Sequence, residues 1–156
     1  TFFVTGSDQP EAQSILRRIV DEGHTIGLLS WSEDYATIYQ SVEAYLEDMN
    51  RLFTYVQDTV GITPSIFRFP GGSVNSYNAG IYRELIAEML RRGFVPFDWN
   101  VSSQDLVATD SAEVSLRVIS LAQTISRSIV GGAQKVVIWY LANMGRISSA
   151  WKRSKS

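Results

Sequence analysis

Two oppositely charged residues, Arg68 and Asp98, each lie within or at the end of a short apolar segment that predicts a buried strand. A buried charge is costly unless it is paired or hydrogen-bonded, so the two side chains are expected to pair. Taken alone, the pair fits a structural ion pair that joins two strands at least as well as it fits a catalytic site. A polar and aromatic stretch at residues 29–35 follows another apolar segment and is a second place where a site could form.

A regular alternation of apolar and amphipathic segments predicts the strands and helices that would position these residues. Apolar runs predict five strands, at residues 2–5, 24–29, 65–69, 94–99 and 136–140. Apolar residues at three-and-four spacing predict four helices, from an Asp8 cap to Gly23, from Val42 to Gly61, from Ile81 to Gly93 and from an Asp110 cap to Gly131. Each of the four glycines is expected to end its helix in the left-handed conformation.

Strict alternation of strands and helices predicts an α/β fold with parallel strands and right-handed crossovers. The fold is then either an open doubly wound sheet or a (β/α) barrel, and about five strands are too few for a closed barrel of seven or eight. In both architectures ligands bind at the carboxyl ends of the strands. The loops to search therefore cover residues 6–7, 29–33, 68–72, 98–103 and 140–143.

The composition narrows the function classes. The chain has 156 residues, 45% of them apolar, which suits one globular domain, expected at residues 1–143, and residues 144–156 are expected to form a solvated basic tail. The formal net charge of −2 and the scattered Lys and Arg argue against nucleic-acid binding. There are no cysteines, and no apolar run approaches the roughly 20 residues that span a membrane. The chain begins without Met in a strand-like segment, so an upstream part is expected to have been removed or left out.

Four short motifs carry a resemblance to a known family. They are FFVTG at residues 2–6, GHTIG at 23–27, RFPGG at 68–72 and FDWN at 97–100. In this order and spacing they closely resemble the polysaccharide deacetylases, the NodB-homology or carbohydrate esterase family 4 domain, from Thr1 to about Ile138. The resemblance implies a distorted (β/α) barrel, here incomplete, that removes acetyl groups from N-acetylglucosamine units of peptidoglycan, chitin or related polymers.

The family's metal site is altered in this chain. The resemblance implies a divalent metal, often zinc, held by one Asp and two His that stand four residues apart after the GHTIG-like segment. In this sequence those two positions are Leu29 and Glu33, and leucine has no lone pair to offer. His24, the one histidine of the chain, matches a non-ligand position of the family. The histidine that acts as the family's catalytic acid is absent from the last motif, and Tyr140, with an unperturbed pKa near 10, is a poor acid in its place. The metal-binding Asp and the base belong to a family motif that would precede Thr1. No metal cofactor is therefore expected in this chain.

The supporting residues of the family's site are present. By family position, Arg68 would orient the absent base and Asp98 would hold Arg68. The Gly71 backbone N–H would face the developing oxyanion, and Pro70 and Trp99 would wall the acetyl pocket. Aromatic rings that could stack on sugars, or could equally form the edge of the core, occur at Trp31, Tyr35 and Tyr77.

Three hypotheses remain open on these residues. The first is a deacetylase-like domain that is inactive in this chain and still binds a carbohydrate polymer. The second is a working deacetylase completed by an upstream segment or a neighbouring subunit. The third is a non-catalytic interaction module that forms a homo-oligomer through the open barrel edge at residues 2–5, in place of the missing barrel segment. The resemblance implies an extracellular or cell-surface location.

Overall fold

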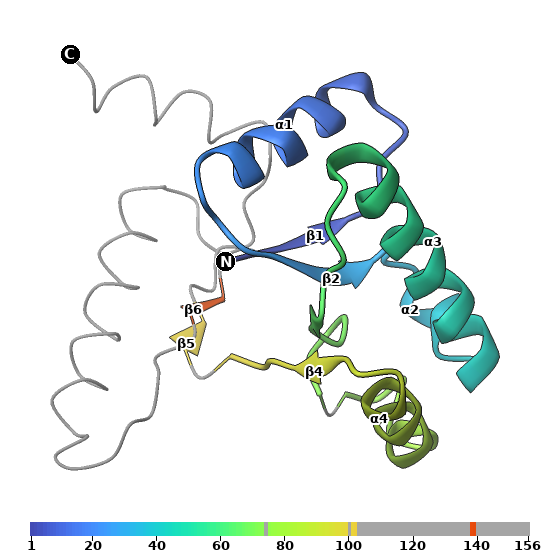
Figure 1. Ribbon diagram of the computed structural model, residues 1–156. Helices are drawn as coiled ribbons and strands as arrows, with labels where there is room; N and C mark the ends of the chain where they lie inside the picture. The colour runs from blue at the N-terminus through green and yellow to red at the C-terminus, as the bar shows by residue number, and fades with distance from the viewer. Residues whose placement is uncertain (74, 100, 103–137, 140–156) are drawn as a thin grey trace, which may run out of the picture. The chain divides into compact units, whose positions relative to one another are not determined.

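The computed structural model describes residues 1–73, 75–99, 101–102 and 138–139, which belong to two compact units, Thr1–Asp98 and Trp99–Ser156 (Figure 1). The first unit holds a parallel sheet in the order β1-β2-β3-β4. Its strands are β1 (Phe2–Thr5), β2 (Ile26–Ser30), β3 (Ile66–Phe67) and β4 (Val95–Pro96). The predicted α/β class with parallel strands is confirmed.

Helices connect the successive strands of this sheet. They are α1 (Pro10–Asp21), the short α2 (Tyr35–Ile38), α3 (Val42–Val60) and α4 (Tyr82–Arg91). Because sequential parallel strands are joined by right-handed crossovers, the connecting helices cover the same face of the sheet. Accordingly, α3 contacts α1 on one side and α4 on the other (Figure 1).

The ends of the helices follow the predicted glycines, with one correction. Gly23, Gly61 and Gly93 have φ angles of 77°, 72° and 86°, which confirms that each adopts the left-handed conformation after its helix. The predicted cap at Asp8 is wrong, because α1 begins at Pro10 and its N-cap position is Gln9 without a side-chain hydrogen bond. Proline suits the first helical position, since its fixed φ is already helical and its missing N–H would have had no partner there.

Several predicted strands differ in length from those observed. β2 begins at Ile26 and continues to Ser30, whereas the strand was expected at residues 24–29. β3 and β4 have only two residues each, although residues 65–69 and 94–99 were expected to be extended. Backbone hydrogen bonds nevertheless continue past both strands, because Arg68 N donates to Leu28 O and Phe97 N donates to Phe67 O. The helix α2 was not predicted; a four-residue helix carries too little periodicity to be recognised.

The second unit contains two short strands, β5 (Val101–Ser102) and β6 (Ile138–Trp139), which pair in parallel. β6 lies within the strand predicted at residues 136–140. Residues 98–103 were expected to form a loop, so β5 is a correction. Val101 and its partner Ile138 are β-branched, which favours extended backbone. The helix predicted from Asp110, Gly131, Tyr140 and the tail at residues 144–156 lie outside the described residues.

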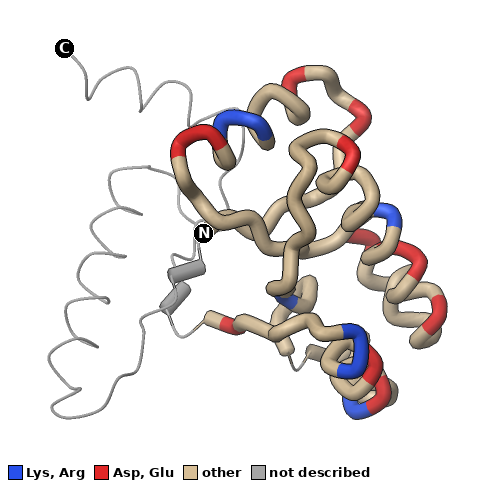
Figure 2. Tube along the Cα trace, viewed as in Figure 1, with Lys and Arg blue, Asp and Glu red and all other residues tan. Residues whose placement is uncertain are grey.

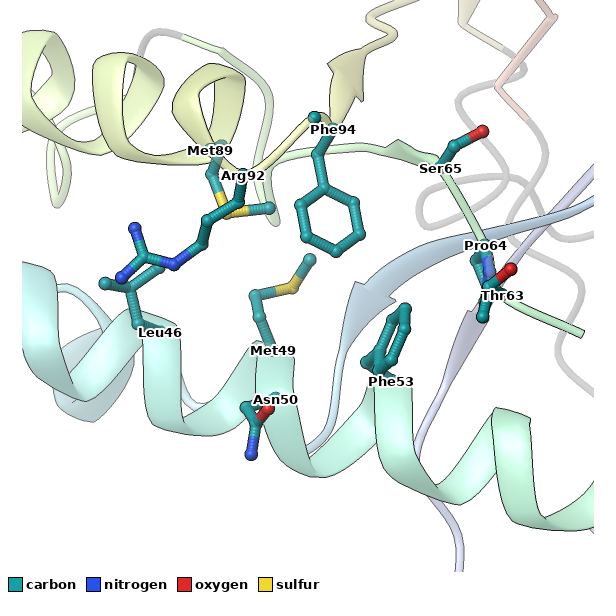
Figure 3. Close-up of a pocket in the computed structure, with 11 residues that line it drawn as sticks. Leu46, Met49, Asn50, Phe53, Thr63, Pro64, Ser65, Met89, Arg92 and Phe94 are labelled. Carbon is teal, nitrogen blue, oxygen red and sulfur yellow. The ribbon is translucent and has the colours of Figure 1, made fainter.

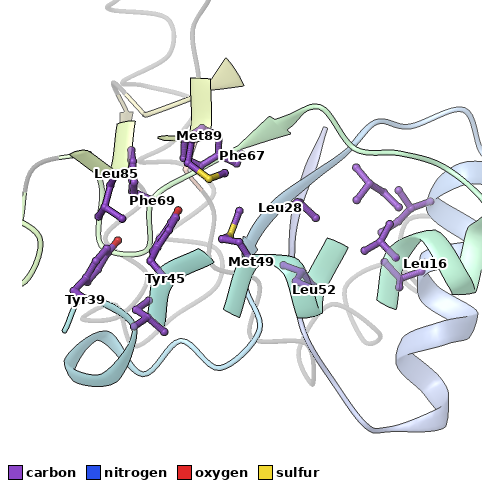
Figure 4. Packing of buried hydrophobic residues seen from close by; sticks show 14 residues of the cluster. Leu16, Leu28, Tyr39, Tyr45, Met49, Leu52, Phe67, Phe69, Leu85 and Met89 are labelled. Carbon is purple, nitrogen blue, oxygen red and sulfur yellow. The ribbon is translucent and has the colours of Figure 1, made fainter. Parts of the chain in front are cut away.

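The core of the first unit is built on the apolar stripe of α3. Its buried side chains lie at the predicted three-and-four spacing, at Tyr45, Met49, Leu52 and Val56. They pack against buried residues of the sheet and of the flanking helices, namely Leu16, Ile19, Ile26, Leu28, Ile38, Tyr39, Phe67, Phe69, Leu85 and Met89 (Figure 4). Burying each large apolar side chain contributes about 1.5–3 kcal/mol, so this cluster holds the sheet and helices together.

Charged residues of both signs occur on the outer helices of the first unit (Figure 2). Several are paired within one helix, as in the contact of Arg18 Nη2 with Glu22 Oε1 at 2.9 Å and that of Arg91 Nη2 with Glu88 Oε2 at 2.9 Å. This mixed pattern offers no extended basic face in the described part of the chain. In that part, every helix is too short or too polar to cross a membrane.

Two stacked tyrosines in the core differ in the hydrogen bonding of their hydroxyl groups. The rings of Tyr39 and Tyr45 lie 5.7 Å apart at an interplanar angle of 12°. The Tyr39 hydroxyl donates to Pro70 O at 2.7 Å, whereas the buried Tyr45 hydroxyl has no hydrogen-bond partner among the described residues. Burial is the main cause that raises the pKa of both phenols.

We predict that Tyr45→Phe raises the free energy of unfolding by about 1 kcal/mol, because the substitution removes an unsatisfied buried hydroxyl. Tyr39→Phe should instead lower it by about 1 kcal/mol, because Pro70 O loses one of its two donors. Urea unfolding followed by tyrosine fluorescence measures both. An equal loss of stability in the two variants would contradict this assignment.

Candidate functional site

Leu29 and Arg68 lie on one face of the sheet, opposite the helices. Side chains alternate along a strand, and Leu28 belongs to the core beside α3 (Figure 4). Leu29 therefore points to the other face, and so does Arg68, which lies between two buried phenylalanines of the same core. Since Arg68 N donates to Leu28 O at 2.9 Å, the two residues sit side by side on neighbouring chain segments.

The Arg68 guanidinium is held in a buried position. Arg68 is only 6% exposed, its Cζ lies 4.1 Å from the centroid of the Phe3 ring, and its Nε donates to Phe97 O at 3.3 Å. Burial lowers the pKa of Arg68, and the negative charge of Asp98 acts against this effect. The electrostatic coupling between Arg68 and Asp98 agrees with the expected pairing, while the role of Arg68 in orienting a base stays a prediction.

Asp98 also links two of the strand-end loops. Its Oδ2 accepts a hydrogen bond from Ser73 N at 3.0 Å, which joins the segment after β4 to the loop that follows β3. The loop after β3 carries Pro70 and Gly71, two of the predicted site residues. The structure thus brings Arg68, Asp98 and this loop together at the carboxyl ends of β3 and β4.

The loop after β2 is organised around a carboxylate that the sequence analysis missed. Asp48 of α3 accepts hydrogen bonds at Oδ2 from Ser30 Oγ (2.8 Å) and Trp31 N (2.7 Å). At Oδ1 it accepts from Ser32 N (3.0 Å) and Ser32 Oγ (2.9 Å). Ser30 Oγ in turn accepts from Glu33 N at 2.9 Å. One side chain therefore binds the backbone N–H groups of Trp31 and Ser32 directly and, through Ser30 Oγ, that of Glu33.

Glu33 occupies an unusual backbone conformation within this loop. Its φ angle is 53°, in the left-handed region that residues other than glycine seldom adopt. Burial raises the pKa of the Glu33 carboxyl. The pKa of Tyr35 is raised first by burial and next by the charge of Glu33, and the Gly71 backbone N–H acts in the opposite direction. The Tyr35 ring lies against Gly71, the residue whose backbone N–H the family resemblance assigns to the oxyanion.

The residues at the family's metal-ligand positions do not fit a metal. Leu29 offers only carbon atoms, and Glu33 is a single carboxylate. Asp48, the acidic side chain that the loop after β2 encloses, already accepts four hydrogen bonds. Within the described residues, no three His, Cys, Asp or Glu side chains gather closely enough to hold a metal ion.

The predicted aromatic residues separate into two settings. Trp31 packs on Gly6, where an added Cβ would lie 2.3 Å from the indole ring, and Arg51 Cζ lies 3.9 Å from the indole centroid. This setting favours the core-edge alternative for Trp31, and its stacking on a sugar stays a prediction. Tyr35 lies instead against Gly71, near the other predicted site residues. Trp99 belongs to the second unit and is half-buried.

His24 lies away from this arrangement. It precedes β2, at the opposite end of that strand from Glu33, and its ring contacts the Phe2 ring at 5.4 Å between centroids. Its Nε2 lies 3.8 Å from Glu22 Oε2. These surroundings favour the structural role expected for His24 at the start of the strand.

A pocket of about 430 Å³ opens between α3 and α4, away from the candidate site (Figure 3). It is lined by side chains of both helices, among them Leu46, Phe53 and Arg92, and by residues 63–65 and 93–94, which precede β3 and β4. The pocket therefore lies toward the amino ends of these strands, whereas the loops that carry the predicted residues lie at the carboxyl ends.

Comparison with known proteins identifies the family of this chain. The family model described as polysaccharide deacetylase matches residues 1–94, which is more than half of the chain. The chain therefore belongs to the polysaccharide deacetylase family.

A peptidoglycan-N-acetylglucosamine deacetylase of Bacillus cereus is 29% identical over 105 residues, 67% of this chain and 37% of that protein. The deacetylase PgdA of Listeria monocytogenes is 28% identical over 120 residues, 77% of this chain and 23% of that protein. The chain thus spans well under half the length of both relatives.

Solved structures confirm the deacetylase barrel as the fold type. The catalytic domain of peptidoglycan N-acetylglucosamine deacetylase from Eubacterium rectale is similar with a TM-score of 0.77 and 29% identity, covering 98% of this chain and 71% of that one. A carbohydrate esterase family 4 esterase of Streptococcus mutans is similar in fold, with a TM-score of 0.68 at 21% identity, covering 98% and 70% of the two chains. Members of this family generally use a divalent metal.

The residues that sequence analysis missed are those that shape the loops. Asp48 lies three residues after Tyr45 and four before Leu52, both fully buried, so a carboxylate on the apolar face of a helix was the available signal. In the loop after β3, Asn75 and Asn78 closely follow two glycines, a composition typical of turns in which asparagine side chains bind the backbone.

We predict that Asp48→Asn lowers the free energy of unfolding by about 2 kcal/mol, because the amide nitrogen cannot accept hydrogen bonds and two of the four donors lose their partner. Asp58→Asn makes the same chemical change at an exposed position of α3 and should alter stability by at most about 0.5 kcal/mol. Urea unfolding compares the two. Equal stability of both variants would show that Asp48 does not hold the loop.

Proposed function

We propose that this chain is a polysaccharide deacetylase-like domain that binds N-acetylglucosamine polymers without carrying out the family's metal-dependent N-deacetylation. One observation carries the proposal: the side chain at the first metal-ligand position is Leu29, and it lies on the same face of the sheet as Arg68, where a ligand would be needed. The substitution lies inside the described chain, so no added segment or subunit could restore a ligand at this position.

The chemistry of amide hydrolysis explains why this loss matters. An acetamide carbonyl is a poor electrophile and water a poor nucleophile, and a bound metal improves both by polarising the carbonyl and lowering the pKa of the water. Glu33 has no histidine beside it in the loop, and the neighbouring Asp34 carboxylate accepts hydrogen bonds from Thr37 N and Thr37 Oγ1, so the two acids do not replace a three-ligand site. The loop after β2 does not need a metal for its shape, because Asp48 already supplies the acceptors that order it.

Residues of the loop after β3 support the proposed sugar contact. Gly71 is exposed on that loop, and the Tyr35 ring lies against it. Pro70 is fully buried, and its carbonyl accepts hydrogen bonds from Tyr39 and Asn75, so it helps to hold the loop from within. The named relatives are peptidoglycan deacetylases, which supports a cell-wall glycan as ligand and a location outside the cell or at its surface.

A second candidate is an interaction module that assembles through β1. This strand lies at one edge of the four-stranded sheet, and Phe2 at its start is 46% exposed. Strand edges with apolar side chains favour pairing with another chain. A homo-oligomer through β1 therefore stays a prediction, and it is compatible with glycan binding.

The purified chain should contain substoichiometric zinc by elemental analysis and should release no acetate from chitin oligomers or peptidoglycan. The double variant Leu29→His, Glu33→His should bind zinc roughly tenfold or more tightly, because it places two imidazoles on a loop that Asp48 already orders. Leu29→Ala, Glu33→Ala is the matched control and should not gain affinity. Stoichiometric zinc with acetate release in the unaltered chain would overturn the proposal.

Glycan binding is tested separately by titration calorimetry. Chitin oligomers should give a saturable binding signal at about millimolar concentrations or below, whereas cello-oligomers, which lack the acetamide groups, should bind more weakly. The comparison isolates the acetamide because the two sugar backbones are otherwise alike. Absence of heat with chitin oligomers at millimolar concentration would remove the glycan-binding function.

A further inference from the structure

Tyr77 is an exposed aromatic side chain in the loop between β3 and α4. It is 54% exposed, the highest value among the large apolar and aromatic side chains of the described residues. Single exposed aromatic side chains are common on protein surfaces, so the exposure of Tyr77 becomes informative only with its position and its neighbours. Its place at the carboxyl end of β3 puts it beside the candidate site and not on the outer helices.

Tyr77 forms a corner with Tyr35, which comes from the loop after β2. The two ring centroids are 5.8 Å apart and the rings are nearly perpendicular, at 78°. Tyr35 itself rests on Gly71, where an added Cβ would lie 3.2 Å from Tyr35 Cε2. The corner therefore has two aromatic walls and the Gly71 backbone at its base, and only a residue without a side chain suits that base.

The position of Tyr77 is fixed by Asn75. The Oδ1 atom of Asn75 accepts hydrogen bonds from Tyr77 N at 2.9 Å and from Asn78 N at 3.1 Å. Its Nδ2 donates to Pro70 O and to Gly72 O, both at 3.1 Å. A single amide thus ties the backbone of Tyr77 to the residues on either side of Gly71.

Asn78 completes the same network from the buried side of the loop. It is fully buried, its Oδ1 accepts from Asn75 N at 3.0 Å, and its Nδ2 donates to Ser73 O at 3.2 Å. The two asparagines together turn the carbonyls of this loop inward. The ring of Tyr77 remains outside this network, on a backbone that is already ordered.

We propose that Tyr77 is a sugar-stacking residue that contacts the apolar face of a pyranose ring next to the unit held at Gly71, and that Asn75 is its positioning residue. This inference rests on the proposed glycan binding. Tyrosine combines a flat apolar face with few rotatable bonds, so a ring on an ordered backbone loses little conformational entropy on binding. The Tyr35 ring packs nearly perpendicular to the Tyr77 ring, and Tyr77 remains more than half exposed to a ligand.

The test is calorimetric titration of the full chain with chitin oligomers. Tyr77→Ala should weaken binding roughly tenfold, and Tyr77→Phe, which keeps the ring, should bind within about twofold of the unaltered chain. Leu90→Ala is the matched control, because Leu90 is 53% exposed but lies on α4. It should leave the affinity unchanged.

The role of Asn75 is tested by a double-mutant cycle. Asn75→Ala should weaken binding, and combining it with Tyr77→Ala should add little, because both substitutions remove the same contact. Asn75→Asp, which keeps the acceptor for Tyr77 N but loses the donor to Pro70 O and Gly72 O, should weaken binding less than Asn75→Ala. A purely structural role would give additive losses, and that result would overturn the positioning role.

The outcomes separate this inference from the function on which it rests. If the unaltered chain binds chitin oligomers and Tyr77→Ala binds equally well, the stacking role is wrong and glycan binding stands. If the unaltered chain does not bind, both proposals fall. If Tyr77→Phe weakens binding as much as Tyr77→Ala, the hydroxyl and not the ring face is the contact, and the stacking role is again wrong.

Discussion

The hydrogen bonds of the Asp48 carboxylate connect the core of the first unit to its candidate site. Asp48 projects from α3, whose apolar stripe fills the core, and it reaches the loop that begins where β2 ends. Hydrogen bonds to a charged acceptor contribute more than neutral ones, about 1.5–3 kcal/mol. The loop is therefore held in place by its hydrogen bonds to α3, the longest described helix. A loop ordered in this way keeps its shape whether or not its ends carry metal ligands, which explains how the fold tolerates Leu29.

Because side chains alternate along the strands, one face of the sheet packs the core and the other carries the candidate site residues. One face packs on α3 and holds the unit together, and the other carries Leu29, Arg68 and their neighbours. Leu29 lies outside the buried cluster that packs on α3. The chemistry of the family can therefore be lost at one position while the surrounding frame is retained. The same reasoning applies to the loop after β3, where asparagine side chains fix the backbone around Gly71 independently of any metal.

The sequence predicted those features that depend on local periodicity. The stripe at residues 42–60 specified α3, and three glycines marked helix ends at their left-handed positions. Two-residue strands such as β3 and β4 carry no period of their own, because they are defined by hydrogen bonds to neighbouring strands. The apolar segments placed Arg68, Asp98 and Gly71 at strand ends, where the structure has them, and the roles implied by the resemblance to the deacetylases stay predictions. The sequence did not reveal Asp48, because an acceptor on one element and its donors 16 to 18 residues away meet only after folding.

The packing of Trp31 on Gly6 makes three distant positions interdependent. Any side chain at position 6 would enter the space of the indole ring, and a smaller residue at position 31 would leave a void beneath the Arg51 guanidinium. Single changes at these sites are therefore each unfavourable, although a joint change could restore the fit. Substitutions at positions 6, 31 and 51 are thus expected to be tolerated together more readily than singly. This couples the residue that follows β1 to a residue of α3.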